Sequence, residues 1–337
     1  MKRYNLAIVG ATGAVGNQMK KIIEERNFPV EKLFLFTSSR SAGKILEFKD
    51  EQITTLELTV DSFKDIEIAL FSAGAKVSKE YAPYAVKEGC LVIDNSSAFR
   101  MEKDVPLVVP EVNPSDLKWH QGIIANPNCS TIQMVMALKP LYDKAGIRRI
   151  VVSTYQSTSG TGWKAMVELR EQCEAVINQK EVNIQVYPHQ IAFNLIPQIG
   201  DFLDNGYTTE EIKMVNETRK ILGDETINIT ATTVRVPVFI SHSEVVNVEL
   251  KQKLTVDEVK RILSNMPGVK VIDNSKNLMY PHPLMAKNTD EVYVGRIRED
   301  LSHPLGINMW IVADNLRKGA ALNAVQIAEK MIELRLI

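Results

Sequence analysis

The stretch that decides the fold is Leu6-Ala-Ile-Val-Gly10-Ala-Thr-Gly13-Ala-Val-Gly16, near the start of the chain. A short apolar run ends in this glycine-rich turn, and a helix-like segment over Val15–Arg26 follows. In such a strand–turn–helix unit, glycines allow a tight turn, let a pyrophosphate approach the backbone, and permit close packing of helix on strand. The free N–H groups and positive end of the helix then hold the phosphates. The stretch therefore predicts a dinucleotide site at Gly10, Gly13 and Gly16.

Short apolar runs alternate with helix-like segments through the first third of the chain, which predicts a mostly parallel, Rossmann-type sheet covered by helices on both faces. Its expected strands are Leu6–Val9, Leu33–Thr37, Ile66–Ser72, Leu91–Asp94, Leu107–Val109 and Ile123–Ala125.

After about residue 145, alternating polar and apolar residues predict a second, α+β domain with a mainly antiparallel sheet, so the fold class is α/β. We expect the last helix, Gly319–Leu334, to return to the first domain. The predicted domains are 1–127 with 315–337 for cofactor binding, and 128–314 for catalysis. The expected strands of the second domain are Ile150–Gln156, Ile227–Phe239, Val245–Leu250, Val292–Ile297 and Met309–Ala313.

The composition excludes several classes of protein. Among 337 residues, 40 basic and 41 acidic side chains leave a net charge of −1, so nucleic acid is not an expected partner. No apolar run reaches the ~18 residues of a membrane span, and the N-terminal run is too short for a signal peptide. Cys90, Cys129 and Cys173 form no close pair, which is typical of the reducing cytoplasm. We expect a soluble cytoplasmic protein and no metal site.

The second predicted strand indicates which nicotinamide cofactor binds. An NAD site usually carries an acidic residue at this strand's end to hold the ribose 2′-hydroxyl. Here the strand ends Thr37-Ser-Ser-Arg40-Ser41, without a carboxylate before Glu47. Hydroxyls and a guanidinium suit a 2′-phosphate, so the sequence favours NADP.

Cys129 is the candidate nucleophile. It lies in Asn126-Pro-Asn-Cys129-Ser-Thr131, directly before the apolar run Ile132–Leu138. This places the thiol at a turn near a helix N-terminus, where the helix dipole stabilises a thiolate. We interpret Cys90 and Cys173 as ordinary structural cysteines.

A thiolate beside a nicotinamide indicates acyl chemistry, with hydride transfer to or from a thioester, and this chemistry needs a proton carrier. Of the five histidines, His242 alone stands close to a lone strand arginine, Arg235, a residue type that binds carboxylates. The two are an odd number of residues apart, so a regular strand would point them to opposite faces. They can share a pocket only if the chain bends, for example at Pro237 or Ser241.

These motifs together carry a family likeness. The glycine turn, Asn126-Pro-Asn-Cys129-Ser-Thr131, Tyr155-Gln156, Arg235-Val-Pro-Val followed by His242-Ser, and Asp314-Asn-Leu-Arg-Lys-Gly319 resemble the aspartate-β-semialdehyde dehydrogenase family. The likeness runs from the first strand to the last helix. One departure is Trp163, where smaller residues are expected after Gly160.

The resemblance implies NADPH-dependent reduction of L-4-aspartyl phosphate to L-aspartate-4-semialdehyde with release of phosphate, in lysine (diaminopimelate), methionine and threonine biosynthesis, by a homodimer. It implies that Cys129 forms the acyl thioester, that His242 is the acid/base, and that Gln156 orients the substrate. The implied substrate-binding residues are Arg235, Glu217, Arg100, Lys220 and Asn128, with the family's E-x-x-K spacing intact at Glu217–Lys220. The implied NADP contacts are Gly10, Thr12, Gly13, Ala14, Val15, Gly16, Ser38, Arg40, Ser41, Ser159, Gly160 and Asn315.

Three other classes of enzyme and one class of non-catalytic protein share some of these features. N-acetylglutamyl-phosphate reductases typically have Gly before the cysteine and an aromatic residue after it, unlike Asn128 and Ser130. Glyceraldehyde-3-phosphate dehydrogenase would need the acidic residue of an NAD site, and short-chain epimerases would need Tyr-x-x-x-Lys, which no tyrosine here provides. A non-catalytic NADP sensor would leave Cys129 and the second domain unexplained.

Overall fold

The computed structural model describes residues 2–337 and divides the chain into two compact units. Unit 1 comprises the residues up to Asn128 together with Ala320–Ile337, and unit 2 comprises Cys129–Gly319. The glycine-rich turn therefore lies in unit 1, whereas Cys129, Arg235, His242 and Asn315 lie in unit 2.

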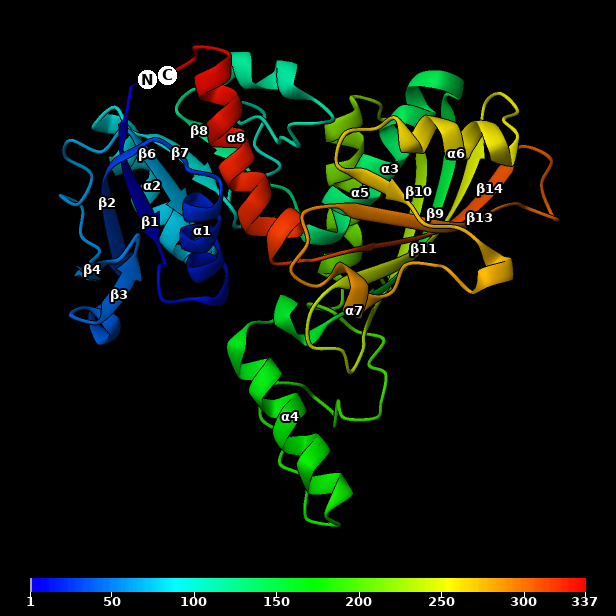
Figure 1. The fold of residues 1–337 in the computed structure, drawn as a ribbon, viewed down its shortest axis with the longest axis horizontal. Helices are drawn as coiled ribbons and strands as arrows, with labels where there is room; N and C mark the ends of the chain where they lie inside the picture. Colours follow the sequence, from blue (N-terminus) through cyan, green and yellow to red (C-terminus); the bar gives the residue numbers. More distant parts are fainter. Residues whose placement is uncertain (1) are drawn as a thin grey trace. The chain divides into compact units, whose positions relative to one another are not determined.

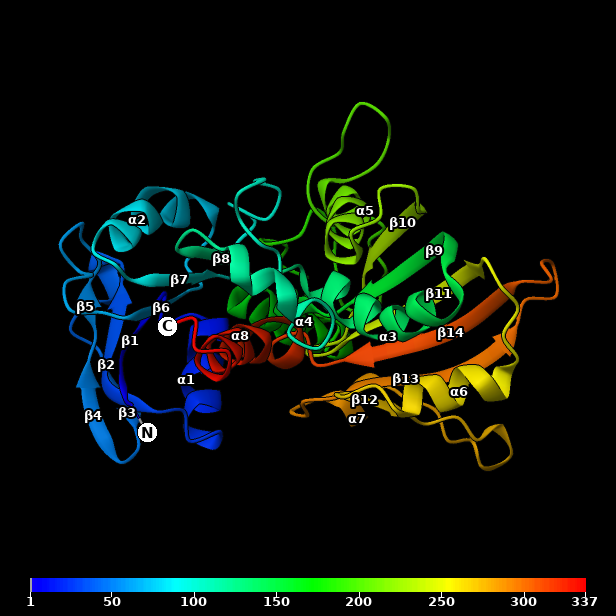
Figure 2. The same ribbon diagram turned by 90° about the horizontal axis from the view of Figure 1, so that it is seen from above.

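Unit 1 is built on a parallel sheet with strand order β5-β2-β1-β6-β7-β8. Alternate residues of β1 face opposite ways: Leu6 and Ile8 pack toward α1 and α8, and Ala7 and Val9 pack toward α2. Helices thus cover both faces (Figure 2), which confirms the predicted Rossmann-type sheet. The elements of unit 1 are β1 (Tyr4–Val9), α1 (Ala14–Glu25), β2 (Val30–Thr37), β3 (Ile45–Phe48), β4 (Glu51–Thr54), β5 (Leu56–Glu57), β6 (Ile68–Phe71), α2 (Ala75–Lys87), β7 (Leu91–Asp94), β8 (Ile123–Ala125) and α8 (Leu322–Glu333).

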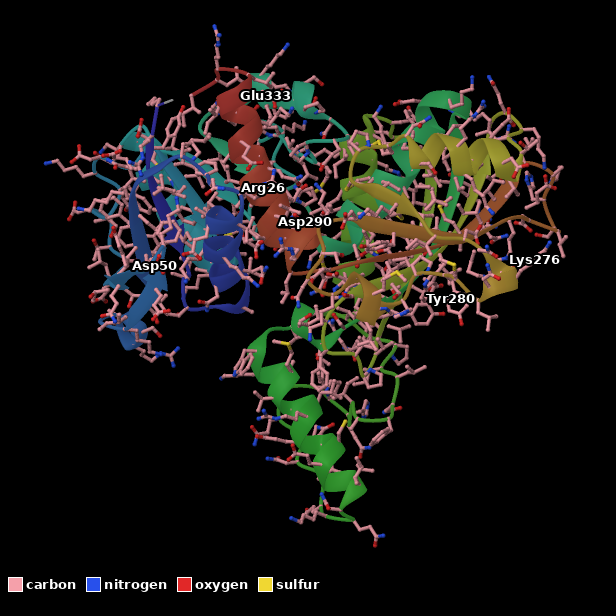
Figure 3. All side chains as sticks on the ribbon, viewed as in Figure 1. Arg26, Asp50, Lys276, Tyr280, Asp290 and Glu333 are labelled. Atoms are coloured by element: carbon pink, nitrogen blue, oxygen red, sulfur yellow. The ribbon has the colours of Figure 1, made fainter. Side chains whose placement is uncertain are left out.

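The C-terminal helix is part of the core of unit 1. Its residues Leu322, Val325 and Ala328 are buried against the sheet and α1. Arg26, at the end of α1, donates two hydrogen bonds of 2.7 Å to the carboxylate of Glu329, and its position beside α8 is visible in Figure 3. The last residues of the chain therefore complete a domain that begins with the first ones.

Unit 2 contains a mixed sheet with strand order β10-β9-β11-β14-β13-β12. The central pairs are antiparallel, while β10 with β9 and β12 with β13 are parallel. α3 packs against β9, β11 and β14 and is buried along most of its length, with α5 and α6 beside it. The elements of unit 2 are α3 (Cys129–Ala145), β9 (Ile147–Gln156), α4 (Trp163–Ile177), α5 (Thr209–Leu222), β10 (Asn228–Arg235), β11 (His242–Leu250), α6 (Val256–Ser264), β12 (Val269–Val271), α7 (Pro283–Ala286), β13 (Val292–Glu299) and β14 (Gly306–Ala313).

One long excursion, residues 163–207, leaves the sheet of unit 2. It consists of α4 and an extended return that projects from the rest of the unit (Figure 1). Its own small core contains Leu169, Ile191, Ala192 and Ile196. We call this segment the α4 excursion.

Two strand predictions are wrong in detail. Leu107–Val109 forms only an isolated parallel bridge, from Leu107 to Ala125, because prolines flank the run and cannot donate to a ladder. The run predicted as Ile227–Phe239 stops at Arg235, and the chain leaves the sheet before β11 begins. Within residues 2–337, no helix is long and apolar enough to cross a membrane.

Candidate active site

The glycine turn of unit 1 has the geometry that its sequence predicts. Gly10 has a φ of +90°, and a methyl group on it would lie 2.9 Å from the carbonyl carbon of Ser72. A methyl group on Gly16 would lie only 2.3 Å from the carbonyl oxygen of Gly10. Gly16 therefore allows α1, which begins at Ala14, to pack directly on the turn. The backbone N–H groups at this helix start are the ones that a pyrophosphate would meet.

A cleft of about 600 Å³ opens over this turn. Gly10, Thr12 and Gly13 line it together with Thr37 and Ser38 at the end of β2. Its size and hydroxyl-rich lining fit the adenosine part of a dinucleotide. Ala14, Val15 and Gly16 lie in the first turn of α1, and Arg40 and Ser41 lie in the short turn after β2, with Arg40 exposed.

Lys76 and Glu57 also line this cleft, although neither was predicted as a site residue. Lys76 lies in the first turn of α2, directly after the glycine turn that follows β6. That second strand–turn–helix unit is a signal that could have identified the lysine. Glu57 pairs with Thr37 across the sheet, a non-local neighbour that spacing along the chain does not reveal.

The Asn-Pro-Asn turn ahead of Cys129 is fixed from several sides within unit 1. Arg100 donates from Nε to the Asn126 carbonyl oxygen at 2.9 Å and from Nη2 to the Asn95 carbonyl oxygen at 3.0 Å. The Asn323 amide donates to Oδ1 of Asn126 at 2.6 Å. Arg100 and Asn128 are themselves buried. The residue predicted to bind phosphate therefore also holds the turn that leads into the candidate nucleophile.

Cys129 is the first residue of α3 and is partly exposed, so its sulfur lies at a helix N-terminus as predicted. A methyl group on Gly319 would lie 2.9 Å from the Cys129 β-carbon, so a glycine is needed where the return chain passes the cysteine. Cys90 is different, because burial raises the pKa of its thiol to about 12. A helix N-terminus instead favours the thiolate form.

Arg235 and His242 lie beside the same glycine, Gly160, because the strand breaks between them. Arg235 ends β10, His242 begins β11, and Ser241 has a left-handed φ of +81°. A methyl group on Gly160 would lie 3.1 Å from both Nη1 of Arg235 and Nε2 of His242. Both side chains therefore lie next to Gly160. The break in the strand near Ser241 allows this, although a regular strand would point residues at this odd spacing to opposite faces.

His242 is fully buried and electrically neutral in this setting. Burial, and then the Arg235 guanidinium, lower the pKa of His242 well below its ordinary value of 6.5, and the Ser241 backbone opposes this shift. Nδ1 accepts a hydrogen bond of 3.0 Å from the Ser157 backbone N–H. The proton of the neutral ring therefore resides on Nε2, which has no hydrogen-bond partner among residues 2–337. Nε2 is therefore the ring nitrogen whose hydrogen-bonding capacity is not used by the described residues.

A serine cluster connects His242 to Asn315. Oδ1 of Asn315 accepts hydrogen bonds of 3.0 Å from the hydroxyls of Ser157 and Ser159 and one of 2.9 Å from the Ser241 backbone N–H. Asn315, predicted as a cofactor contact, thus also fixes the two loops that carry Gly160 and His242. Ser157 is a site residue that the sequence analysis missed.

Gln156 is hydrogen-bonded to α5, the helix that carries Glu217 and Lys220. Gln156 is buried at the end of β9, and its amide donates to Oε1 of Glu210 at 3.3 Å. Glu210, Glu217 and Lys220 lie on α5 at helical spacings of seven and three residues, which place them on one face. Glu217 is buried and Lys220 is partly exposed. Glu210 was likewise not predicted, although its spacing of seven residues from Glu217 could have identified it.

The arrangement defines a class of protein: a nucleotide-dependent dehydrogenase with a Rossmann-type unit and a second unit carrying a helix-terminal cysteine and a buried histidine. Family models agree, since residues 5–120 match the "Semialdehyde dehydrogenase, NAD binding domain" and residues 138–318 match the "Semialdehyde dehydrogenase, dimerisation domain". An aspartate-semialdehyde dehydrogenase of Aquifex aeolicus is 57% identical, with 99% of each chain covered. The chain belongs to the aspartate-semialdehyde dehydrogenase family.

Solved structures of aspartate-semialdehyde dehydrogenases also resemble this chain. The structure of aspartate semialdehyde dehydrogenase II of Vibrio cholerae, complexed with ASA, has a TM-score of 0.95 and 48% identity, and 99% of each chain is covered. The aspartate semialdehyde dehydrogenase of Candida albicans with NADP has a TM-score of 0.80 and 26% identity over 100% of each chain. The fold is therefore shared along the whole length of these relatives.

Proposed function

We propose that this chain is an NADP-dependent aspartate-semialdehyde dehydrogenase that reduces L-4-aspartyl phosphate to L-aspartate-4-semialdehyde and phosphate. The observation that carries the proposal is Cys129 at the start of the buried helix α3, in a chain 57% identical to an aspartate-semialdehyde dehydrogenase. The reaction serves lysine, methionine and threonine biosynthesis in the cytoplasm, where reducing conditions prevent oxidation of the nucleophilic thiol.

Cys129 is the nucleophile of the proposed mechanism. Its thiolate attacks the acyl carbon, the carbon–oxygen bond to phosphate breaks, and phosphate leaves as a thioester forms on Sγ. Bound NADPH supplies the hydride that reduces the thioester carbon. The carbon–sulfur bond of the resulting thiohemiacetal on Cys129 then breaks, which releases the aldehyde and restores the thiolate.

His242 is the acid/base of this mechanism, and Gln156 orients the acyl group. The unpartnered Nε2 of His242 is the ring atom that meets the substrate oxygen, and Ser157 and Asn315 hold the ring and its loops in place. A neutral buried ring beside Gly160 donates a hydrogen bond to negative charge that develops on that oxygen.

The charged side chains bind the two ends of the substrate. Arg235, with Glu217, binds the amino-acid end, because a planar guanidinium pairs with a carboxylate in two parallel hydrogen bonds. Arg100 and Lys220 neutralise the phosphate as it leaves, and Asn128 contacts the substrate beside Cys129. The burial of Arg235, whose Nε has no hydrogen-bond partner among residues 2–337, supports its role, because charged groups are seldom buried without a partner.

The cofactor lies on the glycine turn, and the second unit forms the dimer. NADP contacts come from the residues of the turn, from Ser38, Arg40 and Ser41, and from Ser159, Gly160 and Asn315. Residues 129–319 carry catalysis and homodimer formation, which the match of residues 138–318 to a dimerisation domain supports. Light scattering of the purified protein tests this, and a monomer would contradict it.

The deciding assay is reduction of NADP in the presence of aspartate semialdehyde and inorganic phosphate. We expect phosphate-dependent turnover, none with N-acetylglutamate semialdehyde, and none for Cys129→Ala, which should still bind NADP. Cys173→Ala, at a partly exposed cysteine of α4, is the matched control and should remain active. Turnover by Cys129→Ala would exclude the covalent mechanism, and a preference for the acetylated substrate would favour an N-acetyl-γ-glutamyl-phosphate reductase.

A further inference from the structure

Arg235 is held from two directions by the α4 excursion. Its backbone forms a bridge with Ile196, with hydrogen bonds of 2.8 and 3.0 Å in the two directions. Its guanidinium carbon lies 5.9 Å from the centre of the Tyr187 ring, within the range of a cation–π interaction. Both Ile196 and Tyr187 belong to the excursion, which otherwise has no assigned role.

The Tyr187 ring is itself fixed. Its hydroxyl hydrogen-bonds to Oγ1 of Thr161 at 3.0 Å, in the loop that follows Gly160. Its ring packs against the small core of the excursion, and burial raises the pKa of its hydroxyl. The tyrosine therefore joins the loop beside His242 to the face of Arg235.

α4 holds the segment that carries Tyr187. The buried carboxylate of Glu168 accepts a hydrogen bond of 3.1 Å from the backbone N–H of Gln185, two residues before Tyr187. Oε1 of Gln172, one turn further along α4, accepts from the backbone N–H groups of Ile191 and Ala192 at 2.9 and 3.1 Å. Two buried polar side chains of one helix thus fix the loop on both sides of the tyrosine.

The hydrogen bonds of the Arg235 guanidinium do not by themselves fix its orientation, so the neighbouring Tyr187 ring contributes to it. Arg235 is buried; Nη1 donates to the Ser157 carbonyl oxygen at 2.7 Å, and Nε has no hydrogen-bond partner among residues 2–337. One nitrogen is therefore anchored by a hydrogen bond, and the Tyr187 ring, 5.9 Å from the guanidinium carbon, is the aromatic group beside it. A carboxylate binds well only if the plane of the guanidinium is correctly oriented.

We propose that Tyr187 is a positioning residue for Arg235, and that the α4 excursion exists in part to hold its ring against the guanidinium that binds the substrate carboxylate. The inference rests on the proposed function, since it needs Arg235 to bind that carboxylate. Tyr187 orients the arginine and takes no part in the chemical step. Its loss should therefore weaken substrate binding more than turnover.

The test is steady-state kinetics with aspartate semialdehyde. Tyr187→Leu and Tyr187→Met both remove the aromatic face, and Met keeps much of the volume. We expect KM for the semialdehyde to rise about tenfold in both, the loss expected for a desolvated cation–π contact, with kcat changed less than about threefold. Tyr187→Phe keeps the ring, so its KM should stay within about twofold of the native value. KM for NADP should not change.

Tyr207→Leu is the matched control. Tyr207 lies in the same excursion and also hydrogen-bonds a threonine, with its hydroxyl 2.8 Å from Oγ1 of Thr230. The KM of Tyr207→Leu for aspartate semialdehyde should equal that of the native protein. An unchanged KM in Tyr187→Leu and Tyr187→Met would overturn the inference. The inference would also be overturned if KM rose as much in Tyr187→Phe or in Tyr207→Leu as in Tyr187→Leu.

Arg235→Lys separates this inference from the proposed function. If Arg235 binds the carboxylate, Arg235→Lys raises KM through loss of the bidentate contact. A raised KM in Arg235→Lys with a native KM in the Tyr187 variants rejects only the positioning role. Native KM values in Arg235→Lys and in the Tyr187 variants would reject both the binding of the carboxylate by Arg235 and the positioning role of Tyr187.

Discussion

The glycine turn of unit 1 and the His242 cluster of unit 2 are built in opposite ways. The turn uses neighbouring residues, Gly10 to Gly16: Gly13 and Gly16 lie close to the carbonyl oxygen of Gly10, and Gly10 lies close to Ser72, which follows the neighbouring strand β6. The cluster joins Gly160, Arg235, His242 and Asn315, which come from three separate parts of the chain: the turn after β9, the break between β10 and β11, and the segment after β14. A local site tolerates changes elsewhere in the fold, whereas an assembled site depends on every loop that contributes to it.

The largest expected effect is in the assembled site. His242→Asn removes the ring and its Nε2, so kcat should fall about 10²–10⁴-fold while KM changes little. Steady-state kinetics with aspartate semialdehyde measures both. His303→Asn is the matched control, because His303 lies on a surface loop beside Glu249, and its kcat should match the native value. A native kcat in His242→Asn would remove the residue from the mechanism.

The same contrast explains what the sequence could predict. The glycine turn, the parallel sheet and the helix start at Cys129 depend on spacings of a few residues. Arg235 and His242 come together through a break after β10. Apolar residues continue beyond Arg235, so the sequence pattern does not show where the strand ends. Their odd spacing showed only that a bend was needed.

The residues that spacing missed have non-local partners. Ser157 meets His242, which is 85 positions away, and Glu57 meets Thr37 only through the pairing of β5 with β2. Tyr187 reaches Arg235 through a loop whose position is set by buried polar groups of α4. Such contacts require the tertiary structure, so no local pattern could reveal them.

A smaller effect is expected for cofactor choice at the local site. Arg40→Ala removes the guanidinium predicted to bind the 2′-phosphate, so the preference for NADPH over NADH should fall about 10–100-fold, as expected for lost charge-assisted hydrogen bonds. The ratio of kcat/KM for the two cofactors measures it. Lys44→Ala, an exposed cation a few residues further on, should leave the ratio unchanged. An unchanged ratio in Arg40→Ala would assign the preference to another residue, such as Lys76.

Two alanine substitutions should separate the roles of the glycines. A β-carbon on Gly16 would lie 2.3 Å from a backbone oxygen, so Gly16→Ala should lower the free energy of unfolding by about 1–3 kcal/mol. On Gly13 the same oxygen is 3.3 Å away and φ is −75°, so Gly13→Ala should fold stably but bind NADP more weakly. Urea unfolding and NADP titration of both variants measure these effects. Equal stability of the two variants would contradict the packing role of Gly16.

The smallest effect concerns Glu244, which lies two residues after His242 on β11 and is fully buried. Burial raises the pKa of its carboxyl well above 4.5, and Gln133 on α3 partly opposes this shift. The folded protein therefore keeps Glu244 protonated where the unfolded chain ionises it. This stability is fully present below the ordinary pKa and is lost as pH rises through the raised one.

Glu244→Gln keeps the shape of the side chain but cannot ionise, so it should remove this loss. We expect its free energy of unfolding in urea, relative to the native protein, to be higher at about pH 8 than at about pH 5. Glu171→Gln, at an exposed glutamate of α4, should show no such difference between the two pH values. An identical pH dependence in Glu244→Gln and the native protein would mean that Glu244 is ionised in the fold. The neutral interior beneath the His242 cluster, which lowers the pKa of the histidine, would then hold a charge within two residues of it.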